Sequence, residues 1–464
     1  MIKVDAIIIG SGQAAKPLSL KLAGAGWKTV MVEKSEAELG GACLNVGCTP
    51  TKTLIASAKV MHGIKTAGKH GISVSDLSLD FATTQKRKDT IVADSKDGVK
   101  NRTADAENLE LVYGTASFIG ENAVVVKKKN GEEQEYTAPH IFIDAGTRPT
   151  IPKIRGIDTV KWYDSTGILA LTEIPKKLIV IGGGYIGLEF GQMYSRFGSE
   201  VTVIERGDQI MSTEDFDVAE SLQDLMEAEG MNFILGSAVE ALEEANDAVT
   251  VTYSKDGKNH KITGTHLLLA VGRQSNADGL NTEAAGIALD KKGYVKVNGK
   301  LETNVKGVYA VGDINGGPQF THVAFNDFVV LRNNLLEKID STTDGRIIPY
   351  TMYTDPQLGR VGLSENQARE QGLNFHVISI PGKRITRGIE TGEPQGLWKA
   401  LVDKDSGKIL GAAIVCTEGG EIATVIQMAM EGGIPAKNLA TGMFSHPAYS
   451  ESLNTLFTEL YKIK

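Results

Sequence analysis

The sequence predicts an α/β protein with two dinucleotide-binding βαβ units and a C-terminal α+β region. Two segments share the order strand, glycine-rich turn, helix, strand and acidic residue. A pair of closely spaced cysteines lies shortly after the first of these segments, and from about residue 346 the pattern changes to strands and amphipathic helices. The length of 464 residues suits two to four domains of about 100–200 residues each.

The first βαβ unit begins almost at the N-terminus. The segment V-D-A-I-I-I at 4–9 predicts a strand, and the motif G-S-G-Q-A-A at 10–15 predicts the turn into a helix. The following strand ends at Glu33, 23 residues after the first glycine. In such units the glycines let the backbone approach a pyrophosphate, and the acid binds a ribose. The residues predicted to bind this dinucleotide are Gly10, Gly12, Ala15 and Glu33.

Cys43 and Cys48 form a C-x4-C pair inside the segment 40–52. Pro50 suits the first turn of a helix, so Cys48 is expected at a helix N-terminus, where the helix dipole favours a thiolate. Such a pair can cycle between dithiol and disulfide. The alternatives are half of a zinc site and two buried thiols. No second cysteine pair or nearby histidine cluster supplies the four ligands that zinc needs, so no resident metal site is predicted.

The second βαβ unit repeats the first in the middle of the chain. The strand 178–181 leads into the motif G-G-G-Y-I-G at 182–187, and the next strand ends at Glu205, again 23 residues after the first glycine. One glycine motif could be a tight turn, but two complete units with equal spacing indicate two dinucleotide sites. The residues predicted for this second site are Gly182, Gly184, Tyr185, Gly187 and Glu205.

The remaining pattern supplies the other elements and the domain boundaries. A Lys-rich helical stretch is expected at about 52–108, and hairpins are expected to turn at Asn130-Gly131 and Asp256-Gly257. Buried strands are predicted at 267–271 and 307–311, and helices near 419–432 and 449–463. The predicted division of the chain is 1–150, 151–272, 273–345 and 346–464.

Composition excludes several classes of protein. Lys and Arg number 49 against 57 Asp and Glu, and the resulting net charge of −8 argues against a nucleic-acid-binding protein. No apolar run reaches the ~18 residues of a membrane span, and the N-terminus does not resemble a signal peptide. With only three cysteines, we expect a protein of the reducing cytoplasm. Cys416 lies in an apolar run and is interpreted as a small buried hydrophobic residue.

Taken in order, these motifs resemble the flavoprotein disulfide reductases, a family that includes lipoamide dehydrogenase, glutathione reductase and mercuric reductase. The resemblance covers the whole chain. It implies two Rossmann-like domains, an FAD-binding domain at 1–150 that resumes at 273–345 and an NAD(P)-binding domain at 151–272, followed by a C-terminal dimerisation domain at 346–464 in a homodimer. The motifs that carry it are the two glycine-rich units, the cysteine segment 40–52, T-x5-Y-A-x-G-D at 303–313 and H-P-x3-E at 446–451.

The resemblance assigns further residues to the cofactor sites. Thr303, Tyr309, Gly312 and Asp313 match the second FAD motif, whose aspartate contacts the ribityl or pyrophosphate region. The alternative for Asp313 is a turn aspartate that caps the next segment. The other matched residues lie in the cysteine segment and in the two linkers between the FAD and NAD domains, namely Gly41, Ala145, Gly146, Thr147, Gly272 and Arg273.

Lys52, Glu189 and Tyr185 match residues around the flavin and the nicotinamide. The family places the lysine beside the flavin N5, paired with the glutamate on the NAD-site helix. The alternative for Lys52 is a solvated helix lysine. The aromatic residue covers the nicotinamide pocket in relatives, and ordinary packing is the alternative for Tyr185.

The resemblance implies a general base and a route for electrons. His446, oriented by Glu451, would reach across the dimer and take a proton from a thiol of the other subunit. Hydride would pass from NADH to FAD, then to the cysteine pair, with Cys48 facing the flavin and Cys43 exchanging with a substrate. Glu205 would accept a hydrogen bond from a ribose 2′-OH and repel a 2′-phosphate, which favours NADH. The adjacent Arg206 is compatible with some NADPH use.

We expect the electron acceptor to be a small molecule, a disulfide or a metal ion. Within the family the chain looks most similar to the reactive-chlorine-resistance flavin oxidoreductases, whose known members reduce copper(II), and to the related mercuric reductases. The extra C-terminal cysteine pair of mercuric reductases is missing from the sequence. Dihydrolipoamide dehydrogenase is the alternative enzyme, and an FAD-binding redox sensor with little turnover is the alternative of another class. Two departures from the family pattern are Ala42, in place of a threonine, and Pro17 early in the first helix.

Overall fold

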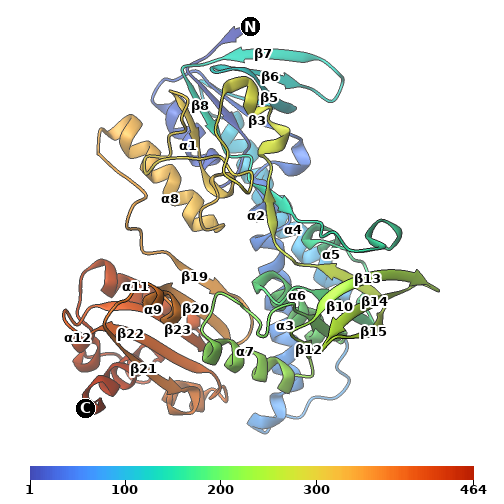
Figure 1. The fold of residues 1–464 in the computed structure, drawn as a ribbon, viewed down its shortest axis with the longest axis vertical. Coiled ribbons are helices and arrows are strands. Elements are labelled where there is room, and N and C mark those ends of the chain that lie inside the picture. Colours follow the sequence, from blue (N-terminus) through green and yellow to red (C-terminus); the bar gives the residue numbers. More distant parts are fainter. Residues whose placement is uncertain (464) are drawn as a thin grey trace. The chain divides into compact units, whose positions relative to one another are not determined.

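The computed structural model describes residues 1–463 and contains two compact units (Figure 1). The first unit consists of residues 1–53, 85–150 and 272–346. The second consists of residues 54–84, 151–271 and the chain from Ile347 onward. Each unit contains one parallel sheet that carries one of the two glycine-rich turns.

A five-stranded parallel sheet forms the centre of the first unit. Helix α1 (Ala15–Gly24) packs against its central strands and against α8 (Thr321–Arg332). The strands β2, β3 and β8 have no polar residues apart from their ends, as expected for a parallel sheet covered on both faces. In spatial order the strands are β18 (Val308–Ala310), β8 (His140–Ile143), β2 (Ala6–Ile9), β3 (Thr29–Glu33) and β4 (Leu109–Tyr113).

A second sheet of the first unit contains one of the predicted hairpins. Strands β6 (Ala123–Lys127) and β7 (Glu133–Thr137) pair antiparallel around Asn130-Gly131, which confirms that prediction. The sheet is completed by β5 (Thr115–Gly120) and by β1 (Ile2–Lys3). Separately, β9 (Thr147–Pro149) pairs with β17 (Arg273–Ser275), so the two predicted linker motifs lie side by side.

The second unit contains the other parallel sheet. Helix α6 (Tyr185–Phe197) packs against β10 and β11 of this sheet, and α7 is Phe216–Ala228. A three-stranded antiparallel sheet of β13 (Ala238–Ala245), β14 (Ala248–Lys255) and β15 (Lys258–Gly264) contains the predicted turn at Asp256-Gly257. The strands of the parallel sheet are, in order, β12 (Asn232–Ile234), β11 (Glu200–Ile204), β10 (Lys177–Ile181) and β16 (His266–Leu269).

The C-terminal part of the second unit is the predicted α+β region. Its five-stranded sheet is antiparallel, and α11 (Gly419–Glu431) packs against β20 and β23. Trp398, on β22, and Cys416, on β23, are both buried in this region, as expected for Cys416. The strand order is β19 (Pro349–Met352), β20 (Gln357–Gly362), β23 (Ile409–Cys416), β22 (Leu397–Asp403) and β21 (Phe375–Pro381).

Two helix predictions need correction. The stretch 52–108 is not one helix but α3 (Cys48–Lys65) and α4 (Phe81–Ala104), separated by a short 3₁₀ turn and irregular chain. Gly71 has a φ of +74° and ends the 3₁₀ turn, and Asp80 accepts hydrogen bonds from Thr83 at the start of α4. The predicted helix at 449–463 is α-helical only in α13 (Ser452–Thr458), with a 3₁₀ turn on each side.

The shorter helices complete the structure. They are α2 (Gly41–Asn45), α5 (Ser165–Leu169), α9 (Glu365–Glu370), α10 (Thr386–Glu390) and α12 (Ala436–Thr441). Among residues 1–463, no helix has both the length and the apolar character that crossing a membrane requires. The α/β fold class is thus confirmed, whereas the four boundaries predicted from the sequence stay predictions.

Candidate active site and nucleotide-binding sites

The first glycine-rich turn joins β2 to α1 and holds its acidic residue in place. Gly10 has a φ of +103°, and a Cβ atom there would lie 2.3 Å from the carbonyl oxygen of Asp144, so only glycine fits. Ser11 donates from its backbone N–H to Glu33 Oε2 at 3.0 Å and also from its hydroxyl group. Because Glu33 is buried, its pKa is raised above the ordinary value. Ser11 was not among the predicted site residues.

Three glycines of the first unit lie close to one another, and the Asp144 carboxyl group lies against two of them. A Cβ atom on Gly12 would lie 2.6 Å from Asp144 Oδ2, and one on Gly41 would lie 2.8 Å from the Cα atom of Gly12. A Cβ atom on Gly312 would lie 2.9 Å from Asp144 Oδ1. We call these three residues the glycine cradle. It exposes backbone at the N-terminus of α1, the surface on which a pyrophosphate binds.

The linker strands connect Asp313 to Arg273. Thr147 donates from its hydroxyl to Asp313 Oδ2 at 3.1 Å, and Arg273 donates to that hydroxyl at 2.8 Å and to the Thr147 carbonyl at 2.7 Å. Burial raises the pKa of Asp313. The structure therefore brings together three of the residues predicted from separate motifs.

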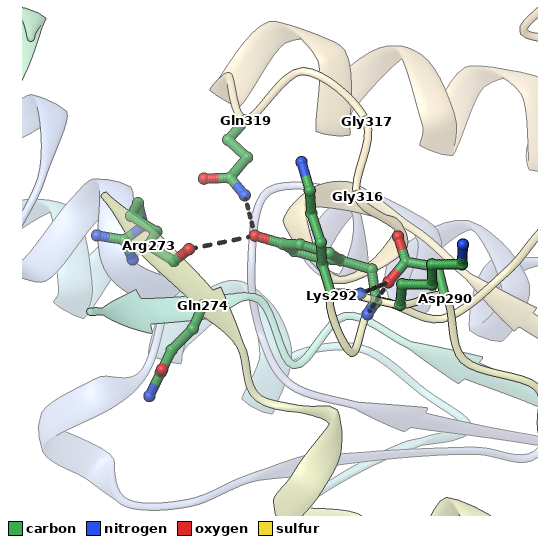
Figure 2. A pocket seen from close by; sticks show the side chains of 9 residues that line it. Arg273, Gln274, Asp290, Lys292, Gly316, Gly317 and Gln319 are labelled. Atoms are coloured by element: carbon green, nitrogen blue, oxygen red, sulfur yellow. Dashed lines mark hydrogen bonds between the residues drawn. The ribbon is translucent and has the colours of Figure 1, made fainter. Parts of the chain in front are cut away.

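A polar cavity of about 740 Å³ lies beside Arg273 in the first unit (Figure 2). The Tyr294 hydroxyl donates to the Arg273 carbonyl at 3.3 Å and accepts from Gln319 at 3.0 Å. Gln319 lies two residues before Thr321, the first residue of α8, whose hydroxyl is 3.3 Å from Cys48 Sγ. The other lining residues are Gln274, Asp290, Lys291, Lys292, Gly316 and Gly317.

Cys43 lies in the middle of α2, and Cys48 begins α3. Cys48 is the first residue of α3, as predicted, and both cysteines are thiols. Cys43 is half-buried and Cys48 is exposed. The pKa of Cys43 is raised because it shares a hydrogen bond with Cys48 and because it is partly buried. Cys43 therefore keeps its proton at neutral pH in the dithiol.

Two residues that the sequence did not identify act on this pair. Thr321, the first residue of α8, lies with its hydroxyl 3.3 Å from Cys48 Sγ, and its hydrogen bond opposes the rise in the pKa of Cys43. Lys16 donates to the Gly40 carbonyl at 3.1 Å, and its charge also lowers the pKa of Cys43. Thr321 ends the segment G-G-P-Q-F-T at 316–321, which is similar to the reactive-chlorine-resistance flavin oxidoreductases, but the resemblance gave this threonine no role. No sequence signal pointed to Lys16.

Lys52 and Glu189 lie in different units of the structure. Lys52 follows Cys48 by one helical turn on α3, so the two share a helix face. Glu189 is buried on α6, where its carboxylate accepts a hydrogen bond from the Tyr353 backbone at 2.8 Å. Their predicted pairing stays a prediction, as does the predicted role of Tyr185 at the start of α6.

The second glycine-rich turn repeats the geometry of the first. Gly182 has a φ of +109°, and a Cβ atom there would lie 2.4 Å from the Ala270 carbonyl oxygen. A Cβ atom on Gly187 would lie 2.2 Å from the Gly182 carbonyl oxygen, so the third glycine also allows close packing. Glu205 accepts from the backbone N–H groups of Gly183 at 2.7 Å and Gly207 at 2.8 Å.

His446 and Glu451 are in contact, as the motif suggested. The imidazole Nδ1 lies 2.9 Å from Glu451 Oε2 and 3.1 Å from Oε1. The His446 side chain is 65 % exposed, and its other ring nitrogen is directed away from the contact with Glu451. The arrangement suits proton transfer at the exposed nitrogen, with the carboxylate orienting the ring.

The two nucleotide sites and the cysteine pair define a class of redox enzyme. Residues 4–327 match the family model for pyridine nucleotide-disulphide oxidoreductases, and residues 348–457 match the model for the dimerisation domain of that family. The chain belongs to this family and is a pyridine nucleotide-disulfide oxidoreductase. The family implies FAD and a pyridine nucleotide as cofactors, and the glycine cradle with Glu33 fits the backbone and ribose of a bound dinucleotide.

Particular relatives cover nearly the whole chain. The chain is 36 % identical over 460 residues to the probable pyridine nucleotide-disulfide oxidoreductase RclA of Escherichia coli K12, covering 99 % of each sequence. It is 35 % identical over 453 residues to the mitochondrial dihydrolipoyl dehydrogenase of Pisum sativum, covering 97 % of this chain and 90 % of that one. A solved structure described as the Cu(II) complex of the HOCl-induced flavoprotein disulfide reductase RclA from Escherichia coli matches with a TM-score of 0.91 and 35 % identity, covering 99 % of this chain and 100 % of that one.

Proposed function

We propose that the chain takes electrons from NADH, stores them in the Cys43–Cys48 pair and passes them to copper(II). The observation that carries this proposal is the cysteine pair itself, with Cys48 exposed at the N-terminus of α3 and Cys43 hydrogen-bonded to it. The similarity to a flavoprotein whose structure is described as a Cu(II) complex supports copper as the acceptor. Thiolate sulfur is also a ligand that favours copper over hard cations.

The two cysteines supply all the electrons that the reduction of copper(II) requires. As the Cys43–Cys48 disulfide forms, the two thiols release two electrons and two protons, and two Cu(II) ions become two Cu(I) ions. Residues 1–463 contain no group of three or more His, Cys, Asp or Glu side chains that could hold a metal ion. We therefore treat copper as a substrate that reacts at the cysteines and not as a resident metal.

The chain's own residues would bind the two nucleotides. In the first unit the glycine cradle would receive the FAD pyrophosphate, Glu33 the ribose, and Asp313 the ribityl region. When bound, FAD supplies the two-electron transfer that links a pyridine nucleotide to a disulfide. In the second unit the Glu205 carboxylate would accept from a free 2′-OH and repel a 2′-phosphate, which favours NADH.

The raised pKa of Cys43 explains why a base would be needed when the acceptor is a disulfide. A thiolate is the attacking species in disulfide exchange, and Cys43 holds its proton. We propose that His446, oriented by Glu451, takes that proton from Cys43 of the partner protomer in a homodimer. The matched dimerisation domain contains this histidine.

Dihydrolipoamide dehydrogenase is the second candidate function. The 35 % identity to a dihydrolipoyl dehydrogenase and the His446–Glu451 contact favour it, because both suit a dithiol substrate that must exchange protons. The test is steady-state turnover with NADH as the donor and copper(II), lipoamide, oxidised glutathione, mercury(II), quinones and oxygen compared as acceptors. Copper(II) should give the highest kcat/KM, and a clear preference for lipoamide would replace the first proposal by the second.

A further inference from the structure

Asp144 is a buried acid in the first nucleotide site that no motif identified. It follows β8 directly and is only 8 % exposed. Its Oδ2 atom accepts a hydrogen bond from the backbone N–H of Ala15, the first residue of α1, at 2.9 Å. Its carboxyl group also lies against Gly12 and Gly312 of the glycine cradle. Asp144 therefore lies directly behind the surface proposed to receive the FAD pyrophosphate.

The second nucleotide site shows that the fold does not require an acid at this place. Ala270 occupies the corresponding position, since its N–H donates to the Ile181 carbonyl at 2.8 Å just as the Asp144 N–H donates to the Ile9 carbonyl at 2.8 Å. A Cβ atom on the first glycine of each turn would also lie at nearly the same distance from the carbonyl oxygen of this residue, 2.3 Å from Asp144 and 2.4 Å from Ala270. A carboxyl group at this position is thus a property of the FAD site only.

The groups around Asp144 favour its neutral form. Burial is the largest cause that raises its pKa, and the nearby carboxylates of Asp313, from the turn after β18, and Asp327, from α8, add to the rise, which brings the pKa to about 8. On α1, the Ala15 N–H and the charge of Lys16 oppose this rise. At physiological pH, Asp144 is accordingly protonated for most of the time.

The charges of the neighbouring groups are already engaged elsewhere. Arg346 pairs with Asp327 at 2.7 Å, and the charge of Arg273 lowers the pKa of Asp313. Lys16 donates to the Gly40 carbonyl, and burial lowers the pKa of Lys16. No cation therefore pairs directly with Asp144 among the residues that the structure describes, so an ionised Asp144 would add an uncompensated charge next to the anionic pyrophosphate.

We propose that Asp144 positions FAD as a neutral carboxylic acid and that its ionisation weakens FAD binding. The neutral group keeps Oδ2 as the acceptor for the α1 N-terminus and can carry its proton on Oδ1, the oxygen next to Gly312. The ionised group repels the two negative charges of the pyrophosphate. This inference rests on the proposed FAD site in the first unit.

The expected pH dependence follows from proton linkage. A bound dianion raises the pKa of Asp144 above its value of about 8 in the protein without cofactor. Between these two values the complex holds a proton that the free protein has lost, so FAD affinity falls as pH rises. Below about pH 7 the affinity should be constant, and above about pH 8 it should fall by up to ~10-fold per pH unit.

The experiment measures the FAD dissociation constant of the holoenzyme from pH 6 to 10, by the flavin fluorescence that appears on dilution. The Asp144→Asn variant, which keeps an acceptor and a donor without a charge, should match the low-pH affinity of the unchanged protein and lose the alkaline fall. The Asp144→Ala variant, which mimics Ala270, should bind FAD more weakly at every pH and also lack the fall. The flavin itself also ionises in this pH range, and this contribution cancels in the ratio of the FAD dissociation constants of the unchanged protein and each variant.

Two results would overturn the proposal. One is an FAD affinity of the unchanged protein that does not vary with pH, which decides the matter even if neither variant folds. The other is an alkaline fall in Asp144→Asn as steep as that of the unchanged protein. A purified protein that binds no flavin at any pH would instead reject the proposed FAD site, so the two failures are distinguishable.

Discussion

The two glycine-rich turns share a backbone and differ in the side chains behind it. In both, the first glycine has a φ above +100°. Its N–H donates to a carbonyl of the neighbouring strand, that of Val32 at 2.8 Å in the first turn and that of Ile204 at 2.9 Å in the second. In both, the acidic residue accepts from the backbone N–H of the turn's second residue, at 3.0 Å for Glu33 and 2.7 Å for Glu205. The backbone alone therefore specifies a dinucleotide site and not which dinucleotide it holds.

The two turns differ in the side chains that pack against their backbone. Asp144 contacts the first turn, and Ala270 holds the corresponding position in the second. At the position five residues after the first glycine, the first turn has Ala15 and the second has Gly187. Glu33 is buried and additionally held by a serine hydroxyl, whereas Glu205 is partly exposed and held by backbone groups alone. Around its acid and around Gly12, the first turn is therefore more closely packed than the second turn is around Glu205 and Gly184. Such a site suits a cofactor that stays bound, and the more open site suits a nucleotide that exchanges.

The largest expected effect is that of replacing His446, which should impair the thiol chemistry and leave both nucleotide sites intact. His446→Ala should lower turnover with lipoamide by about 10²–10⁴-fold, because Cys43 keeps its proton and loses its base. Reduction of the flavin by NADH should be nearly unchanged. The loss with copper(II) should be much smaller, because a metal ion that coordinates the Cys43 sulfur itself displaces the thiol proton, which can pass to water. Steady-state and stopped-flow rates on both acceptors check this, and equal, negligible losses would reject His446 as the base.

A matched pair of glycine substitutions tests the packing difference directly. A Cβ atom on Gly12 would lie 2.6 Å from Asp144 Oδ2, whereas one on Gly184, its counterpart, has no atom within 4 Å. Gly12→Ala should therefore cost about 1–3 kcal/mol of FAD binding, or about 5–150-fold in affinity. Gly184→Ala should leave FAD binding unchanged.

The double variant Gly12→Ala with Asp144→Ala sharpens this test. Removing the carboxyl group should recover part of the lost affinity, because it removes the atom that the new methyl group meets. Additive losses in the double variant would show that Gly12 is required for another reason. Flavin fluorescence measured on all four proteins completes the cycle.

An effect of similar size, but on the other nucleotide, is expected from the acid of the second site. Glu205→Arg should raise the ratio of NADPH to NADH use by about 5–150-fold, since removing a like charge beside a 2′-phosphate is worth about 1–3 kcal/mol. FAD content should not change, because Glu205 belongs to the other unit. The measurement is kcat/KM for both nucleotides. An unchanged ratio would mean that nucleotide choice depends on other residues.

Features with local sequence signals were predictable. The spacing from glycine to acid identified both turns, Pro50 indicated that Cys48 begins a helix, and Asn130-Gly131 identified a hairpin. Each of these depends on residues that are close in the sequence. The fold class and the family followed from the order of such motifs.

Features that depend on distant residues were not predictable. Asp144 is a single acid after a strand, and its neutral form results from burial and from Asp313 and Asp327, which come from two other segments. Thr321 meets Cys48 across 273 positions of sequence. By contrast, the break between α3 and α4 had local signals, the turn residue Gly71 and the helix-capping Asp80, which the prediction of one long helix overlooked.

The central claim is that electrons leave the enzyme through the Cys43–Cys48 pair. The most direct test is Cys43→Ser, titrated anaerobically with NADH while the flavin absorbance is followed, and assayed in parallel for turnover with copper(II) and lipoamide. The account predicts a flavin that NADH still reduces and a loss of turnover with both acceptors, because Cys43 exchanges with the acceptor and takes no part in hydride transfer. Normal turnover by this variant would contradict the account and remove the cysteine pair from the mechanism.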